Sequence, residues 1–361
     1  LPFEWDTSGV LQGILVEPQA TNLNPYSRPQ AAWGIKVGYA LTENSISGVL
    51  GGTTSVTLLT RTAGQAYAAG PSGIAKAAAA MQYTRSMIVK KSVGDYLTST
   101  IQGAGGGERS NASFNLSTGA VISTQVVGTF TGASARVINL GDGWYRLTHT
   151  ATTSTDLTVN AYLSIGSVLL ASVDASDTGY AGTVASVYVE HDQLETGAVP
   201  TSPITTYGAS AVRANDSQTL AYSRLPTMSG SGYSLFVHAV LRYGPNGGYQ
   251  TFLALRNAAF SEVATLNVNT AGALKLYAVA AGIVSADISS GVTQSNGVPF
   301  KIAGSWAPND FRISGNGSAV VSDTSGAKPS AFTLLEIAGS YAPFYVKSAV
   351  ITPHPSTNTE L

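Results

Sequence analysis

The chain has 361 residues, a length that favours two domains at about 150 residues each. Only 11% of the residues are charged and the formal net charge is −1, which argues against electrostatic binding of nucleic acid or anionic lipid, because such binding needs a clustered excess of Lys and Arg. There is no cysteine, which excludes disulfides, thiolate metal sites and a cysteine nucleophile.

The first residues of the given sequence show no signal-peptide pattern. Residues 1–20 lack a basic segment followed by an apolar core, and no apolar run in the chain reaches the ~18 residues that span a membrane. We therefore expect neither a signal peptide nor membrane insertion. The chain begins LPFEWDTSG, without Met, which indicates a processed or truncated piece of a longer protein.

The first half of the chain is dominated by strand patterns. β-Branched or alternating runs between Gly, Asn, Asp and Ser clusters predict strands. These runs cover residues 56–60, 86–92, 96–102, 135–140, 145–152, 157–164 and 184–195. Asp142 and Gly143, just before Trp144, predict a tight hairpin turn. For the Ala-rich stretch 75–81, a short helix and the end of a buried strand both stay open.

Strand patterns resume after Gly208. The runs are residues 234–243, 251–257, 263–269, 273–282, 300–307, 310–316, 332–339 and 344–353. We therefore predict an all-β fold of two tandem antiparallel β-sandwich (jelly-roll) domains, covering residues 1–207 and 208–361. The boundary is expected in an exposed stretch between Thr201 and Asp216, which carries Pro, Gly and Ser.

Acidic residues offer one catalytic hypothesis. Glu190, Asp192 and Glu195 form the densest acidic cluster, and Glu262 lies in the second half. Glu190 and Asp192 would share one face of a strand, where two carboxylates could cleave a glycosidic bond. Outward-facing residues or a structural cation site are the alternatives, and we favour them.

The other residue types that carry chemistry are scattered. His149, His191, His238 and His354 lie far apart without the spacing of a metal site, and no GxSxG motif occurs. We predict no catalytic residues.

Two aspartates in one turn suggest a cation site. Asp174 and Asp177, in the segment DASDTGY, could supply oxygen ligands to a calcium ion. Solvated turn carboxylates are the alternative.

Aromatic residues in loop-like segments suggest sugar binding. Tyr outnumbers Phe by 17 to 10, and the apolar faces of sugars stack on such rings while sugar hydroxyls bond to polar side chains. The candidate carbohydrate-binding residues are Tyr243, Tyr249, Tyr180, Asp177, Trp33 and Tyr341. Trp144 and Trp306 stand at strand starts and are predicted to be core residues.

Four segments of the first half resemble a known family. They are GILVEPQATN (13–22), FNLSTGAV (114–121), GDGWYRL (141–147) and QLETGAVPTSPITTYG (193–208). Their order is similar to that in carbohydrate-binding-like modules of bacteriophage tail fibres, head spikes and gene transfer agents. The resemblance implies that the first and last strands of this module pair, which would let Glu17 and Glu195 contribute to a structural calcium site.

The second half resembles laminin-G and concanavalin-A-like sandwiches. The similarity lies in WAPNDFRISGNGSAVVSDTSG (306–326) and in AVITPHPSTNTEL (349–361), which is like the closing strand and tail of phage-associated versions.

Together the two resemblances imply a non-enzymatic adhesin on the surface of a virion or phage-like particle. It would bind capsule polysaccharide at the host cell surface as a homo-oligomer, most simply a trimer. A capsule depolymerase and a purely structural spacer are the alternatives.

Overall fold

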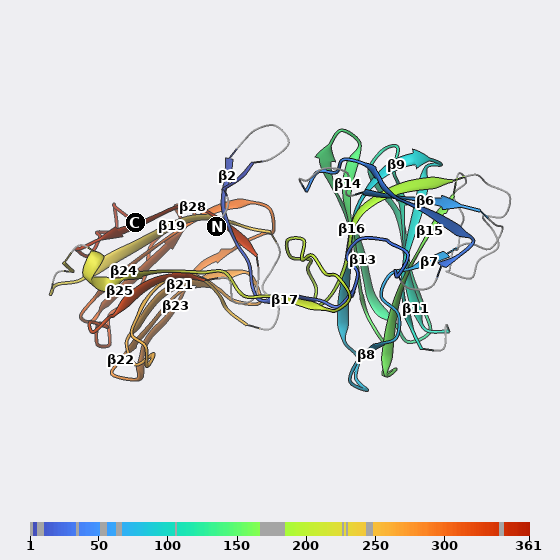
Figure 1. The fold of residues 1–361 in the computed structure, drawn as a ribbon. Coiled ribbons are helices and arrows are strands. Elements are labelled where there is room, and N and C mark those ends of the chain that lie inside the picture. Colours follow the sequence, from blue (N-terminus) through green and yellow to red (C-terminus); the bar gives the residue numbers. More distant parts are fainter. Residues whose placement is uncertain are drawn as a thin grey trace. The chain divides into compact units, whose positions relative to one another are not determined.

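The computed structural model places most of the chain in β-strands (Figure 1). It describes residues 3–5, 11–33, 36–50, 56–62, 67–104, 107–166, 185–225, 227–228, 230–242, 248–338 and 343–361. The chain forms two compact units. One, here called the inserted unit, is Ala20–Arg213; the other, the split unit, joins Leu1–Gln19 to Ala214–Leu361.

The inserted unit holds two antiparallel sheets. The strands of sheet 1 are β4 (Lys36–Val37), β7 (Tyr67–Ala69), β8 (Ile74–Ala75), β10 (Tyr96–Gly103), β11 (Arg109–Asn115), β12 (Ala120–Val127) and β15 (Thr158–Gly166). The strands of sheet 2 are β5 (Tyr39–Ile46), β6 (Val56–Arg61), β9 (Gln82–Val93), β13 (Thr131–Gly141), β14 (Trp144–Thr152) and β16 (Ser186–Thr196). Their orders are β12-β11-β10-β15-β7-β4, with β8 beside β15, and β13-β14-β9-β16-β6-β5. A short pair joins β3 (Ala20–Asn22) to β17 (Ala211–Arg213).

The two sheets of the inserted unit enclose a shared apolar core. Leu97, Phe114 and Leu163 of sheet 1 pack with Val89 and Leu147 of sheet 2. Such packing between facing sheets defines a β-sandwich.

The split unit holds two further antiparallel sheets. The strands of sheet 3 are β1 (Phe3–Trp5), β2 (Leu11–Val16), β19 (Tyr233–Leu241), β24 (Pro299–Ala307), β25 (Asp310–Gly315), β26 (Val321–Asp323) and β28 (Phe344–Thr352). The strands of sheet 4 are β18 (Ser217–Ala221), β20 (Gln250–Arg256), β21 (Val263–Val268), β22 (Ala273–Ala280), β23 (Ile283–Thr293) and β27 (Leu334–Ala338). Their orders are β1-β2-β28-β19-β24-β25-β26 and β18-β27-β20-β21-β22-β23.

Alternation along the strands of sheet 4 separates its two faces. Leu274 and Leu276 of β22 point into the core, where they pack with Ile302 and Trp306 of sheet 3. The residues between them on β22 therefore point to the opposite face of the sheet. The predicted fold class, all-β with two antiparallel β-sandwiches of the jelly-roll kind, is confirmed, and Trp306 and Trp144 are buried as expected.

The N-terminal strand differs from the expectation. β2 pairs with β28, with Ile14 opposite Val346 and Val16 opposite Phe344. Val16 belongs to the core of the split unit. For residues 11–16, the expectation that the segment opens the first module and pairs with that module's last strand is therefore wrong, because their buried face complements a strand more than 300 residues away in the chain. Residues 20–22 of the same segment do open the inserted unit, where the Leu23 N–H donates to the Leu194 carbonyl of β16 at 2.7 Å.

The stretch expected to be an exposed linker is partly buried. Thr201, Ile204 and Thr206 are all buried. Thr206 exchanges hydrogen bonds with Ser27, and Asn22 Nδ2 donates to the Ile204 carbonyl at 2.9 Å. The chain leaves the inserted unit only after Arg213, whereas the sequence pattern had placed the division at residues 207 and 208.

Two local predictions have clear outcomes. Asp142 and Gly143 link β13 to β14 with positive φ values of 50° and 77°, as a type I′ hairpin turn requires. The Ala-rich stretch forms β8 followed by irregular chain, and Lys76 Nζ donates to the carbonyls of Ala77 and Ala79. In the described ranges the only helical element is the 3-10 turn Tyr222–Arg224, so no helix there could cross a membrane.

Candidate functional site

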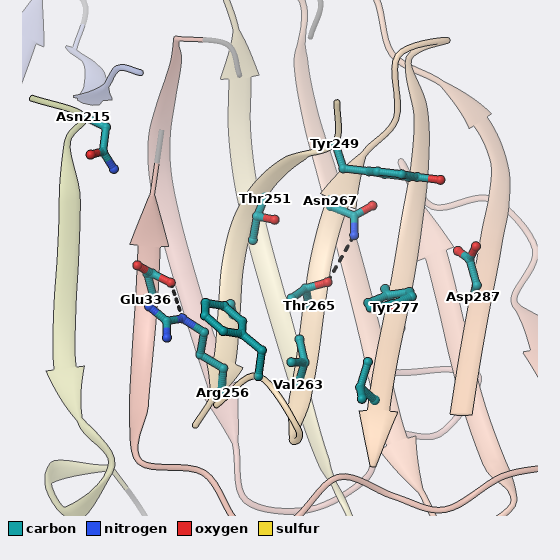
Figure 2. A pocket seen from close by; sticks show the side chains of 13 residues that line it. Asn215, Tyr249, Thr251, Arg256, Val263, Thr265, Asn267, Tyr277, Asp287 and Glu336 are labelled. Atoms are coloured by element: carbon teal, nitrogen blue, oxygen red, sulfur yellow. Dashed lines mark hydrogen bonds and ion pairs between the residues drawn. The ribbon is translucent and has the colours of Figure 1, made fainter. Parts of the chain in front are cut away.

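The outward face of sheet 4 contains a cavity of about 620 Å³. Its described lining residues come from strands β20, β21, β22, β23 and β27, from the turns next to them, and from Asn215 just before β18. Figure 2 shows their side chains on one side of the sheet. Because these strands bury their alternate residues in the core, the polar and aromatic positions of each strand are left for this face.

Strand register brings three residues of the cavity into one row. Thr265 of β21 lies opposite Tyr277 of β22, which lies opposite Asp287 of β23. Two residues further along β21, Asn267 lies opposite both Thr251 of β20 and Lys275 of β22. Rigid neighbouring strands therefore hold a hydroxyl, a phenol ring and an amide close together.

Two tyrosines give the cavity aromatic surface. Tyr249, immediately before β20, is 50% exposed, and Tyr277 is half-buried. Both rings lie on the cavity side of the sheet (Figure 2). Exposed tyrosine rings beside polar groups are suited to ligands with both an apolar face and hydroxyl groups.

Two ion pairs flank these aromatic and polar groups. Arg256 Nε donates to Glu336 Oε2 at 2.6 Å, and the guanidinium lies 4.3 Å from the ring centroid of Phe260. The Arg256 hydrogen bond holds the pKa of Glu336 below its usual value. On the other side, Lys275 Nζ lies 2.6 Å from Asp287 Oδ1 and 5.7 Å from the ring centroid of Tyr249.

Asn267 places a free acceptor in the cavity wall. Its Nδ2 donates to Thr265 Oγ1 at 3.1 Å (Figure 2). Its Oδ1 is buried and has no hydrogen-bond partner among the residues that the structure describes. A buried acceptor without a donor costs free energy, which a ligand donor can recover.

The predicted sugar-binding residues fall into three groups. Tyr249 lies in the cavity wall. Trp33 is 0% exposed and packs in the core of the inserted unit, so its ring is not accessible for stacking on a sugar. The remaining candidates lie outside the described residues: Tyr243, Tyr180, Asp177 and Tyr341.

The expected calcium ligands lie in different parts of the chain. Glu17 belongs to the split unit, where its carboxylate lies 3.9 Å from Arg242. Glu195 belongs to the inserted unit and accepts hydrogen bonds from Thr201 and Gln193. Asp174 and Asp177 lie outside the described residues. Within the described ranges, no three His, Asp or Glu side chains gather as metal ligands would.

The acidic cluster is built into the inserted unit. Glu190 accepts the backbone N–H groups of Val49 and Leu50, and it sits at a register shift in β16 between Val189 and His191. We expected Glu190 and Asp192 to lie on one face of the strand. The bulge at Glu190 interrupts the strict alternation of side chains on which that expectation depends.

The other carboxylates of the catalytic hypothesis are also engaged. Asp192 is buried against Arg85. Burial raises the pKa of Glu195, but that carboxylate is enclosed by its hydrogen-bond donors. Glu262, in the split unit, accepts the backbone N–H groups of Ala281 and Ser330 at 2.9 Å each.

Sequence reasoning missed Thr265, Asn267 and Tyr277 because it looked for binding residues in loops. The signal was present in the strand pattern of β22, in which Lys275 and Tyr277 alternate with buried Leu274 and Leu276. Asn267 and Thr265 interrupt the otherwise apolar strand β21 in the same way.

No protein-family model matches the chain, and no curated protein matches it. Among solved structures, a carbohydrate-binding module, CBM66 from Bacillus subtilis, is similar at 13% identity over 40% of this chain and 86% of that chain, with a TM-score of 0.30. Sheep galectin-11 is similar at 10% identity over 38% and 96%, with a TM-score of 0.27. The LG1-3 region of the laminin alpha2 chain is similar at 10% identity over 96% and 66%, with a TM-score of 0.29. Scores of this size assign neither a family nor a ligand to the chain.

Proposed function

We propose that the outward face of sheet 4 binds carbohydrate. The observation that carries the proposal is the grouping of Tyr249 and Tyr277 around the unpartnered acceptor Asn267 Oδ1, in a cavity of about 620 Å³. The rings supply stacking surface for the C–H face of a sugar, while Asn267, Thr251 and Thr265 meet its hydroxyls. A site of this composition on a rigid sheet is suited to binding a ligand without chemical conversion.

A glycan array followed by calorimetric titration tests the proposal. Tyr249→Ala should weaken binding of the selected glycan by about fivefold, since one aromatic contact contributes on the order of 1 kcal/mol. The melting temperature should not change, because the ring is half exposed. Tyr207→Ala is the matched control, since Tyr207 is an exposed tyrosine of the inserted unit. Equal loss in both variants would contradict a site on sheet 4.

The biological setting is a further part of the proposal. The resemblance of residues 13–22, 114–121, 141–147 and 193–208 to modules of phage fibres and spikes supports a role in adhesion to capsule polysaccharide. Several copies on a phage-like particle, as a trimer or other homo-oligomer, would raise the effective concentration of weak sites. Adsorption measured on capsule-deficient host cells tests this role, and unchanged adsorption would contradict it.

The depolymerase and spacer alternatives have separate readouts. We expect purified capsule polysaccharide incubated with the protein to gain no reducing ends and no unsaturated uronates. A time-dependent gain would support the depolymerase. The absence of any heat or thermal shift with every host glycan would support the spacer.

A further inference from the structure

We infer that the cavity on sheet 4 selects neutral, hydroxyl-rich glycans over glycans that carry carboxylates. This inference rests on the proposed function and concerns the ligand class of the same site. Its basis is the distribution of charge and of hydrogen-bonding groups around the cavity.

The two cations that the described residues place at the cavity are already paired. Arg256 is held by Glu336 at 2.6 Å and Lys275 by Asp287 at 2.6 Å. Arg256 and Lys275 also lie over the rings of Phe260 and Tyr249. An acidic sugar would have to displace an internal carboxylate to gain a cation of its own, and it would then stand beside the displaced charge.

The described cavity has balanced charge. The charged lining residues are Arg256, Asp287 and Glu336, and Lys275 lies next to the cavity, so two cations face two carboxylates. The other described lining residues are uncharged. No net positive potential therefore attracts an anionic ligand to this face.

Asn267 adds a requirement of its own. The residue is 5% exposed, and its unpartnered Oδ1 accepts but cannot donate. A sugar hydroxyl or an amide N–H satisfies this atom. A carboxylate in the same place would bring lone pairs against lone pairs and lose its own hydration, so the wall of the cavity disfavours it.

The experiment compares matched oligosaccharides that differ only at C6. Tetramers of glucose, galactose and mannose are titrated against the corresponding glucuronate, galacturonate and mannuronate tetramers at low ionic strength. For each pair that binds, we expect the neutral member to bind at least about tenfold more tightly. Glu336→Gln releases Arg256 and should narrow or reverse that ratio.

Asp310→Asn is the control variant. It releases Arg312, which pairs with Asp310 on β25 of sheet 3, and should leave the ratio unchanged. A uronate that binds the native protein as tightly as its neutral partner would overturn the selectivity while leaving carbohydrate binding intact. An unchanged ratio in Glu336→Gln would show that the pairing of Arg256 with Glu336 is not the cause of the selectivity. Failure of every pair to bind would overturn the proposed function, and the selectivity with it.

Discussion

Arg85 of β9 binds both carboxylate oxygens of Asp192 on β16, with Nε 2.8 Å from Oδ1 and Nη2 2.9 Å from Oδ2. Neither side chain is exposed. Gly70 passes so close to this pair that a Cβ at that position would collide with the Asp192 carboxylate. An aspartate that the sequence offered as half of a catalytic pair is thus part of the interior of the inserted unit.

Asp192→Asn should destabilise the inserted unit by roughly 3–5 kcal/mol, because it leaves the Arg85 guanidinium buried without its counter-charge. Urea unfolding measures the loss. Asp95→Asn is the control, since Asp95 pairs with Lys91 at the surface, and the loss of this solvent-screened pair should cost far less stability. Equal urea midpoints for the two variants would show that the buried ion pair contributes no more to stability than the surface pair does.

Trp144→Ala should cost roughly 3–5 kcal/mol, the usual effect of deleting a large buried aromatic side chain. The ring packs with Val56 and Ile88 in a small buried cluster at the end of the Asp142-Gly143 turn. Thermal melting and titration with the selected glycan are measured together. Val121→Ala, at an exposed position of β12, is the control and should be nearly neutral. Loss of glycan binding without loss of stability would place Trp144 in a binding site instead.

Local patterns predicted the strands well. The alternation in residues 263–269 and 273–282 corresponds to β21 and β22, and the Asp-Gly pair gave its turn. These features depend on neighbours in the sequence, such as the inward Leu276 and outward Tyr277, and so are visible in it.

Long-range relationships were not visible in the sequence. Nothing local indicates that β2 pairs with β28, since Ile14, Leu15 and Val16 would suit the edge of either sandwich. The site on sheet 4 was missed for the same reason. Asn267 becomes a cavity acceptor only when the register of three strands sets it beside Thr251 and Lys275.

The buried histidines should make stability fall in mild acid. Burial lowers the pKa of His149 to about 3, with Arg85 adding to the effect, and His149 lies between Ser110 and Ser99. In the unfolded chain the His149 ring binds a proton as the pH falls below 6.5, whereas in the folded chain it does so only near pH 3. This contribution to stability is therefore complete above pH 6.5 and is lost as pH falls.

His149→Gln isolates that contribution. Between pH 7.5 and pH 5, the native protein should lose about 2 kcal/mol more stability than the variant. The measurement is urea unfolding at both values of pH. Parallel pH profiles for the native protein and His149→Gln would show that the buried ring takes up its proton in the folded state.

The last prediction concerns the split unit. The fragment 208–361, which the sequence pattern defines as a complete domain, lacks β2. The edge of β28 at Phe344 and Val346 is therefore left without its partner strand. Joining residues 1–19 to 214–361 through a flexible linker restores the strand and buries Leu15 and Val16 again. We expect the joined protein to melt cooperatively and the fragment to melt at lower temperature or to aggregate, because an unpaired apolar edge promotes association. Circular dichroism and size-exclusion chromatography measure both. In the full-length chain, Gly13→Ala should weaken the same edge, because its φ of 121° is strained for alanine and the added Cβ would meet the Val346 carbonyl. Identical melting of the fragment and the joined protein would show that β2 adds nothing to the fold and that residues 208–361 are a domain by themselves.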